Sequence, residues 1–190
     1  MDRAAQPTDA SLLERVAGGD REAFRSLYER YQRRIHSYCL KFVRDPRKAE
    51  ELTNDVMFEV WRGAAGFRGH SSPSTWILGI ARHKALSEAR RREEPVLPEP
   101  EEAHAMPDPA EGPAETAERA DVARALRGAL EKLSVEHREV LELTYYQELS
   151  CQEIAEVLQC PVGTVKTRMF YARQRLKAIL AGTGIAGDQP

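Results

Sequence analysis

Apolar residues recur at helical spacing along most of the chain, which predicts an all-α protein. Between residues 20 and 92 three such segments follow one another, with helices expected over 23–43, 46–64 and 75–92. In the first, side chains three or four positions apart would form one buried stripe. These are Ala23, Phe24, Leu27, Tyr31, Ile35, Tyr38 and Phe42. No stretch alternates with period two for long enough to predict a strand.

Capping residues indicate where these helices begin. Asp20 would cap the first helix, and Asp45 followed by a proline marks the start of the second, because proline fits the first helical position. The third helix is expected to begin near Ser74 or Thr75, after a loop over 66–74 that is rich in Gly and Ser. It ends in three consecutive arginines.

A second helical region spans residues 119–182. Its first two helices are expected over 119–133 and 135–149, and Ser134 would cap the second of them. The apolar positions expected to face inward are Val122, Leu126, Leu130, Leu133, Val140, Leu141 and Leu143.

Residues 150–180 hold two helical patterns of opposite charge, joined by a short turn. Ser150 opens the first pattern, and Glu153 three residues later completes a capping box. The side chains expected to face inward there are Ile154, Ala155 and Leu158. Because the turn is only a few residues long, the two helices must cross steeply, as they do in a helix-turn-helix.

The last helix separates an apolar side from a basic side. On a helical wheel at about 100° per residue, the apolar side consists of Val165, Met169, Ala172, Leu176 and Ile179. From residue 161 to residue 180 the chain carries five Lys or Arg and no acid. Such a face suits the major groove of DNA, where polar and aromatic tips meet base edges and cations meet phosphates. A surface helix with a solvated basic face is the alternative interpretation.

Charge divides the chain into three parts, although the net charge is only -2. Residues 20–92 carry 16 bases against 9 acids, and residues 119–180 carry ten bases against eight acids. Residues 93–118 carry nine acids, six prolines and neither Lys nor Arg. This middle part has no apolar period, and its prolines favour extended chain. We interpret it as a flexible acidic linker, either a solvated spacer or a mimic of nucleic acid in a basic channel of a partner.

The expected organisation is two small helical domains around this linker. Its parts are an N-terminal extension (1–19), a first module (20–94), the linker (95–118), a second module with the helix-turn-helix (119–182) and a tail (183–190).

Catalysis, metal binding and membrane insertion find no support in the sequence. Cys39, Cys151 and Cys160 lack the paired spacing of zinc sites, although His36 one turn before Cys39 makes a half-site conceivable. Core cysteine is the simpler interpretation, and a redox role stays open for Cys160 in the turn. The chain has no run of about 18 apolar residues and no secretory signal. We therefore expect a cytoplasmic protein that is not an enzyme and uses no cofactor.

Two motif sets carry a family resemblance. The first is AEELTNDVMFEVWR, then GF, STWILGIAR and a terminal RRR; the second is LSCQEIAEVLQCPVGTVKTRMFYARQRL. In this order they resemble the extracytoplasmic-function (ECF) group of bacterial RNA polymerase sigma factors, from about Asp20 to Leu180. The resemblance implies a chain that binds core RNA polymerase at the β′ clamp and β flap and directs promoter-specific initiation. It also implies an anti-sigma factor as a partner.

Three sets of site residues are implied by this resemblance. Polymerase binding is expected at Glu50, Glu51, Asn54, Asp55, Phe58 and Trp61. Melting and reading of the downstream (−10) element, which needs stacking surfaces and phosphate contacts, is expected at Phe67, His70, Ser71, Trp76, His83, Arg90, Arg91 and Arg92. Recognition of the upstream (−35) element is expected at Thr164, Lys166, Thr167, Arg168, Phe170, Tyr171, Arg173 and Gln174.

The chain departs from the family pattern at three positions. His83 stands where the family often has Asn, Ser87 where it often has Asp, and Tyr171 where it commonly has Arg. The first two put the downstream sequence preference in doubt, and the third exchanges a cation for an aromatic ring. Trp61 and Trp76 could instead be core anchors.

A stand-alone helix-turn-helix regulator is the alternative function. It would need a dimer, because single half-sites bind weakly, and an N-terminal domain with an effector pocket. The sequence offers neither a clear dimer helix nor an apolar pocket, and residues 20–92 are basic.

Overall fold

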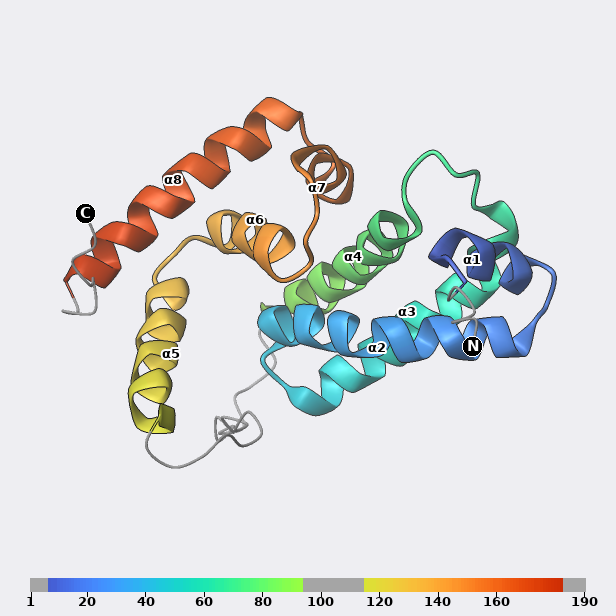
Figure 1. Ribbon diagram of the computed structural model, residues 1–190, viewed down its shortest axis with the longest axis horizontal. Coiled ribbons are helices and arrows are strands. Elements are labelled where there is room, and N and C mark those ends of the chain that lie inside the picture. The colour runs from blue at the N-terminus through green and yellow to red at the C-terminus, as the bar shows by residue number, and fades with distance from the viewer. Residues whose placement is uncertain (1–6, 94–114, 183–190) are drawn as a thin grey trace, which may run out of the picture.

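The computed structural model describes residues 7–93 and 115–182, and every regular element in these ranges is a helix (Figure 1). The first domain contains α1 (Asp9–Ala17), α2 (Arg21–Val43), α3 (Pro46–Gly63), the short 3₁₀ helix η1 (Ala64–Gly66) and α4 (Pro73–Glu93). The second contains α5 (Glu115–Glu131), α6 (Val135–Tyr145), α7 (Cys151–Leu158) and α8 (Val162–Ala181). The all-α prediction is confirmed for the described residues.

The predicted caps hold the long helices of the first domain. The Asp20 carboxylate accepts the backbone N–H groups of Glu22 and Ala23 at 2.9 and 3.0 Å. These bonds, with help from Arg15, lower the pKa of Asp20. Asp45 caps α3 in the same way, with proline in its first turn. Charged caps of this kind are favourable because the helix N-terminus leaves N–H groups unpaired.

The buried face of α2 matches the predicted stripe at five of its seven positions. Ala23, Leu27, Tyr31, Ile35 and Tyr38 are at most 1% exposed. The two remaining aromatic rings are only partly buried and pack at the edge of the core. The facing helices complete the core with apolar side chains of α3 and α4, which are Ala49, Leu52, Val56, Met57, Val60, Ile77, Leu78, Ala81 and Ala85.

Helix α1 belongs to this core, although residues 1–19 were expected to be an extension. Leu12, Leu13 and Val16 are 0–3% exposed. Asp9 fastens the helix to α2 through an ion pair with Arg30 at 2.6 Å and a hydrogen bond from the Tyr31 hydroxyl. The first domain therefore begins before residue 20. The signal was three apolar residues in a nine-residue helix, too short a pattern to stand out.

The linker and the first helix of the second domain differ from expectation at two points. Most of the predicted linker lies outside the described residues, but positions 115–118 are the first turn of α5. Val122 is 45% exposed and not part of the core. Leu133, which was predicted to face inward, is buried at 4%, and Ala129, which was not, is buried at 2%. Helix α5 packs against α8, and the burial of Ala129 and Leu133 places its core contacts near its C-terminal end.

The two helices of the predicted helix-turn-helix correspond to α7 and α8. Ser150 accepts the Glu153 N–H at 3.3 Å while the Glu153 carboxylate accepts the Ser150 N–H at 3.0 Å, which is a complete capping box. Helix α7 ends at Gln159, whose φ of 52° lies in the left-handed region. After this turn α8 crosses α7 steeply (Figure 1). Val165, Met169 and Ala172 of α8 are buried against α6 and α7.

Candidate nucleic-acid interface

Helix α8 presents a broad exposed face with no acid. Lys166, Thr167, Phe170, Tyr171, Arg173 and Gln174 are all exposed, while Thr164 and Arg168 are half-buried. The rings of Phe170 and Tyr171 are 57% and 53% exposed and meet edge to face at 5.4 Å. Large apolar rings on a free surface indicate a binding function. The face thus combines cations and aromatic rings in the way that a helix in the major groove requires.

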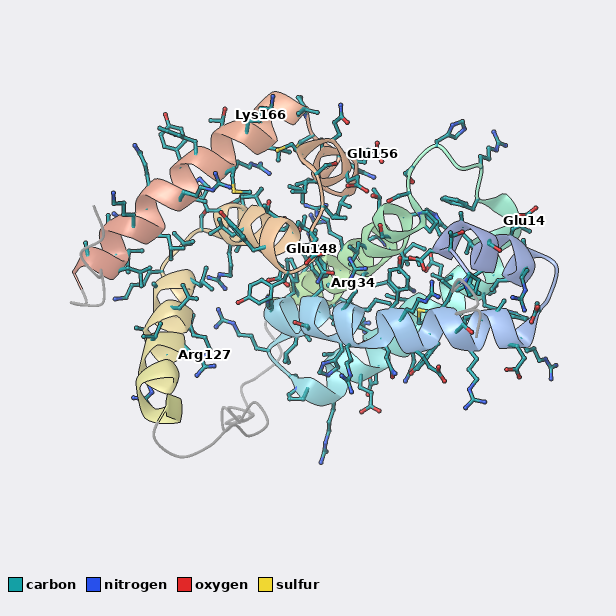
Figure 2. The ribbon with its side chains drawn as sticks, viewed as in Figure 1. Glu14, Arg34, Arg127, Glu148, Glu156 and Lys166 are labelled. Atoms are coloured by element: carbon teal, nitrogen blue, oxygen red, sulfur yellow. The ribbon has the colours of Figure 1, made fainter. Side chains whose placement is uncertain are left out.

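The start of α8 is also electropositive. Pro161 occupies the N-cap position and has no side-chain group that could accept the N–H groups of the first turn. Two of these groups make turn bonds to the Pro161 carbonyl, from Thr164 at 2.9 Å and Val165 at 3.3 Å. The positive end of the helix dipole therefore adds to the charge of Lys166. In Figure 2 Lys166 lies in this first part of α8, at the upper edge of the view.

The exposed face of α3 holds five of the six residues of the predicted polymerase-binding set. Glu50, Glu51, Asn54, Asp55 and Phe58 are exposed, Phe58 at 60%. An exposed aromatic ring beside several acidic side chains fits a protein-binding surface. The guanidinium of a neighbouring arginine lies over the Phe58 ring at 5.7 Å.

Trp61 is the exception in this set. It is half-buried, and its ring meets Phe24 edge to face at 5.1 Å as part of the core. Its main contacts are therefore structural, which was the alternative interpretation of this tryptophan.

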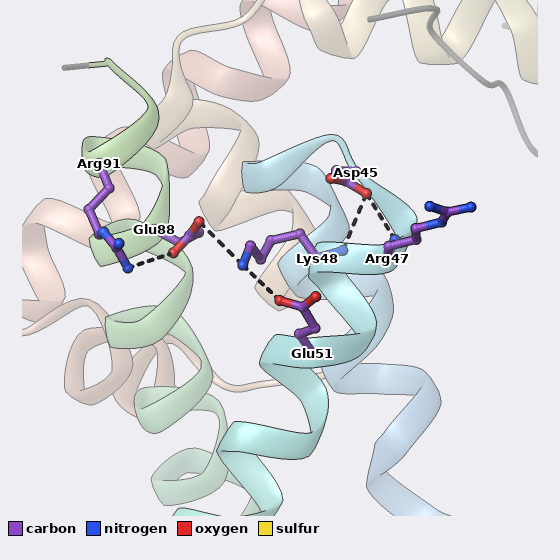
Figure 3. A network of polar contacts seen from close by, with 6 residues as sticks. All are labelled: Asp45, Arg47, Lys48, Glu51, Glu88 and Arg91. Atoms are coloured by element: carbon purple, nitrogen blue, oxygen red, sulfur yellow. Dashed lines mark hydrogen bonds and ion pairs between the residues drawn. The ribbon is translucent and has the colours of Figure 1, made fainter. Parts of the chain in front are cut away.

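A chain of ion pairs joins this face to the end of α4 (Figure 3). Lys48 lies between Glu51 at 2.7 Å and Glu88 at 3.8 Å, and Glu88 also pairs with Arg91 at 3.6 Å. The hydrogen bond to Glu51 is the main reason that the pKa of Lys48 is raised. Asp45 accepts the Lys48 N–H at 3.2 Å and so holds the start of α3 beside it. The Arg91 side chain is 78% exposed, whereas Glu88 is only 16% exposed.

The loop before α4 supplies an aromatic stack. Phe67 and Trp76 lie with ring centroids 5.1 Å apart, tilted by 44°. Gly69 has φ +71°, a conformation that a side chain would strain. His70 beyond it is exposed. Trp76 also lies 3.2 Å from where a Cβ on Gly63 would be, so a glycine there makes room for the ring.

Most of the predicted −10 residues surround one open hollow on α4. Its lining includes His70, Ser71, Trp76, His83, Arg90 and Arg91. Phe67 is not part of the lining, because its ring stacks behind Trp76. Arg92 lies in the last turn of α4, and its side chain is outside the described residues. The hollow is wide, and cations and an aromatic ring are part of its lining. These features suit an unstacked strand of nucleic acid.

Sequence reasoning missed three charged side chains that line this hollow. Glu59 lines it from α3, Arg82 from α4, and Glu156 from α7 of the second domain. Arg82 stands next to His83 and could have been found by a helical wheel of α4. Glu156 could not, because only the packing of the two domains brings it there.

The three cysteines are free thiols. Burial raises the pKa of Cys39 to about 12. Cys151 and Cys160 are half-buried free thiols. Within residues 7–93 and 115–182 no three His, Cys, Asp or Glu side chains gather closely enough to hold a metal ion. In the same ranges no helix is both long and apolar enough to cross a membrane.

Two family models match the chain in the order of its domains. Sigma-70 region 2 matches residues 27–94, and Sigma-70 region 4 matches residues 123–176. The RNA polymerase sigma-H factor of Pseudomonas aeruginosa is 34% identical over 184 residues, covering 92% of this chain and 95% of that protein. The ECF RNA polymerase sigma factor SigK of Mycolicibacterium vanbaalenii is 31% identical over 178 residues, covering 93% and 89%.

Solved structures share the fold. CnrH, in complex with the cytosolic domain of CnrY, gives a TM-score of 0.68 at 24% identity and covers 92% of this chain and 97% of that one. The sigma factor RpoE of Bartonella quintana, in complex with the anti-sigma factor NepR, gives a TM-score of 0.66 at 22% identity. The match covers 83% of this chain and 96% of that one. Together with the two matched regions and the curated relatives, these findings place the chain in the sigma-70 family, as a sigma factor of the ECF group.

Proposed function

We propose that this sigma factor divides its work among three surfaces. The exposed face of α8 recognises the −35 element in the major groove. The hollow on α4 and the loop before it capture the melted −10 strand. The exposed face of α3 binds the β′ clamp of core RNA polymerase, and the second domain contacts the β flap. The chain itself performs no covalent chemistry and acts in the cytoplasm, where the polymerase is.

One observation carries this assignment. The exposed face of α8, free of acids and bearing Lys166, Phe170 and Tyr171, lies on the opposite side of the helix from its buried face. A duplex can therefore approach α8 without displacing any part of the domain core. The acidic face of α3 has the opposite character, which suits a protein partner and would repel DNA.

The first experiment is co-elution of the purified chain with bacterial core RNA polymerase on a sizing column, without DNA. We expect a stoichiometric complex. Replacing Asp55 and Phe58 together by Ala should weaken it, because these exposed side chains have no role in the core, so helicity should stay unchanged. Glu14→Ala is the control, since Glu14 is an exposed acid on a different helix, α1 (Figure 2).

The outcomes separate the possibilities. Loss of co-elution only in the Asp55/Phe58 variant supports the α3 surface. Equal binding by that variant and the wild type removes it. If the folded wild-type chain does not bind the polymerase at all, a stand-alone regulator becomes the better description, and a dimer with a palindromic site should be sought.

An anti-sigma factor is a further expected partner. RpoE of Bartonella quintana was solved with such a protein, and the present chain shares its fold. A cognate anti-sigma factor should compete with core polymerase for the chain in the same co-elution assay. A factor that binds the chain together with the polymerase would contradict this.

A further inference from the structure

Helices α2 and α3 pack against each other, and one hydrogen bond between side chains joins them at the solvent edge of this contact. The Tyr28 hydroxyl of α2 donates to Asn54 Oδ1 of α3 at 2.8 Å. Asn54 is exposed and belongs to the predicted polymerase-binding set, whereas Tyr28 is half-buried and lies outside that set. The bond therefore connects the candidate binding face of α3 to a residue on the neighbouring helix.

Aromatic contacts hold the Tyr28 ring in place. Its centroid lies 6.4 Å from that of Phe24, one turn earlier on α2, with the planes tilted by 58°. Phe24 in turn meets Trp61 of α3 edge to face at 5.1 Å. Trp61 and Asn54 lie about two turns apart on the same side of α3, because seven residues at about 100° each return almost to the starting direction. The contacts thus run from α3 to α2 and back to α3, and they fix the place of the Tyr28 hydroxyl.

The hydrogen bond also determines which way the Asn54 amide faces. An asparagine amide carries one acceptor oxygen and an NH₂ group with two donor hydrogens. Because the oxygen faces the Tyr28 hydroxyl, the NH₂ group is directed away from it. To no other residue within 7–93 and 115–182 does this NH₂ group donate a hydrogen bond. Its two donors are therefore available to a partner.

A donor at this position differs from the groups around it. The other exposed polar members of the set are Glu50, Glu51 and Asp55, whose carboxylates accept hydrogen bonds. Cations on a partner can pair with such a row of acids in more than one register. An acceptor on the partner, either a carboxylate or a backbone carbonyl, finds its donor within this set only at Asn54. The amide is therefore suited to fixing the register of the partner on α3.

We propose that Tyr28 is a positioning residue for the polymerase-binding face of α3. Its hydroxyl holds the Asn54 amide so that the NH₂ group points to a hydrogen-bond acceptor on the polymerase. The Asn54 side chain then loses little conformational freedom on binding, because it already has the bound orientation. Tyr28 acts through Asn54, and Phe24 and Trp61 support it from behind. The inference rests on the proposed function of the α3 face.

Tyr28→Phe removes the hydroxyl and keeps the ring that packs on Phe24. Affinity of the full-length chain for core RNA polymerase is measured by competition with wild-type chain labelled at its N-terminal amine and read by fluorescence anisotropy. We expect Tyr28→Phe to weaken binding about two- to tenfold, the effect of fixing one side chain in advance. Ser26→Ala is the control and should bind like the wild type. It removes a hydroxyl from the same helix, but the bond of that hydroxyl, to the Glu22 carbonyl at 3.0 Å, stays within α2.

A double-mutant cycle separates positioning from a merely structural role. Asn54→Ala should weaken polymerase binding more than Tyr28→Phe does, because it removes the donors themselves. Tyr28→Phe/Asn54→Ala should bind as Asn54→Ala does, since no amide remains to be positioned. If Tyr28→Phe weakens binding by the same factor in both backgrounds, Tyr28 does not act through Asn54 and the proposal is overturned. A Tyr28→Phe variant that binds like the wild type would overturn it as well.

Asn54→Asp tests whether the NH₂ group is the part of the amide that matters. The variant keeps an oxygen for the Tyr28 hydroxyl but loses both donors. On an acidic face that binds cations, an added carboxylate by itself should strengthen binding. The loss of the donors should instead weaken it at least as much as Asn54→Ala does. Binding as tight as that of the wild type, or tighter, would refute the assigned role of the NH₂ group.

The orientation of the amide can also be followed in the free chain. The nitrogen-15 order parameter of the Asn54 side chain reports its motion on the picosecond to nanosecond timescale. We expect an ordered amide in the wild type and in Ser26→Ala, and a mobile one in Tyr28→Phe. An equally ordered amide in Tyr28→Phe would show that the hydroxyl does not hold it, which contradicts the proposal.

Failure of the proposed function gives a different result. If α3 does not bind the polymerase, the variant with Asp55 and Phe58 both replaced by Ala binds like the wild type. If that variant loses binding while the variants of Tyr28 and Asn54 do not, the α3 surface stands and only the positioning role of Tyr28 is wrong.

Discussion

Replacing Lys166 by Ala tests the −35 surface most directly. Lys166 is exposed in the first turns of α8 and makes no ion pair within the described residues. Its removal therefore costs the fold nothing, and Ala is at least as good a helix former. If Lys166 contacts a base edge, binding should weaken by about 1–3 kcal/mol, which is about 5- to 140-fold. If Lys166 contacts only phosphate, the loss of affinity is the same for every DNA sequence. The slope of log affinity against log salt concentration then decreases in magnitude by about one.

The assay is anisotropy of labelled promoter DNA with the reconstituted holoenzyme, at several salt concentrations. Lys177→Ala is the matched control. Eleven residues at about 100° each bring Lys177 to almost the same side of α8, but about 16 Å further along its axis. Because groove contacts come from the start of a recognition helix, Lys177→Ala should have little effect. Equal losses for both variants, or no loss for Lys166→Ala, would refute the proposed docking of α8.

Three further predictions concern the fold that holds these surfaces. Ser150→Ala removes one half of the capping box of α7, an eight-residue helix. It should destabilise the second domain by about 1 kcal/mol in thermal unfolding. Unchanged stability would show that tertiary contacts alone hold α7. The hydrogen bond from the Ser150 N–H is the main reason that the pKa of Glu153 lies below its usual 4.5. The stability that the ionised Glu153 contributes is therefore complete above pH 4.5. It is lost as the pH falls through the lowered pKa. A carbon-13 NMR titration of the Glu153 carboxyl in wild type and Ser150→Ala should show the pKa still lowered but rising slightly in the variant, because Ala keeps the backbone N–H and only the hydroxyl bond is lost. Leu12→Ala opens a cavity at a side chain that is 0% exposed. It should lower the free energy of unfolding in urea by about 2–5 kcal/mol. A loss below about 0.5 kcal/mol, the range of surface substitutions, would mean that α1 is dispensable for the first domain.

The sequence by itself determined where most helices lie and which side of each is buried. Caps such as Asp20, Asp45 and Ser150 act on N–H groups two or three residues away, and the buried positions of α8 recur every three or four residues. Such interactions depend only on near neighbours along the chain, so local patterns predict them. The candidate surfaces on α3 and α8 followed from the same wheels, together with the family resemblance.

Only the tertiary structure decided which surfaces the apolar side of each helix packs against. Val122 belongs to an apolar period and is nevertheless 45% exposed, whereas Leu12, in a short pattern, is 0% exposed because α1 packs against α2. Tyr38 and Glu139 are 101 residues apart in sequence, and no local period predicts that they touch. Their contact depends on how two finished domains fit together. The structure thereby shows that Glu139 and Glu142 of α6 are buried against the first domain, which no helical wheel of α6 predicts.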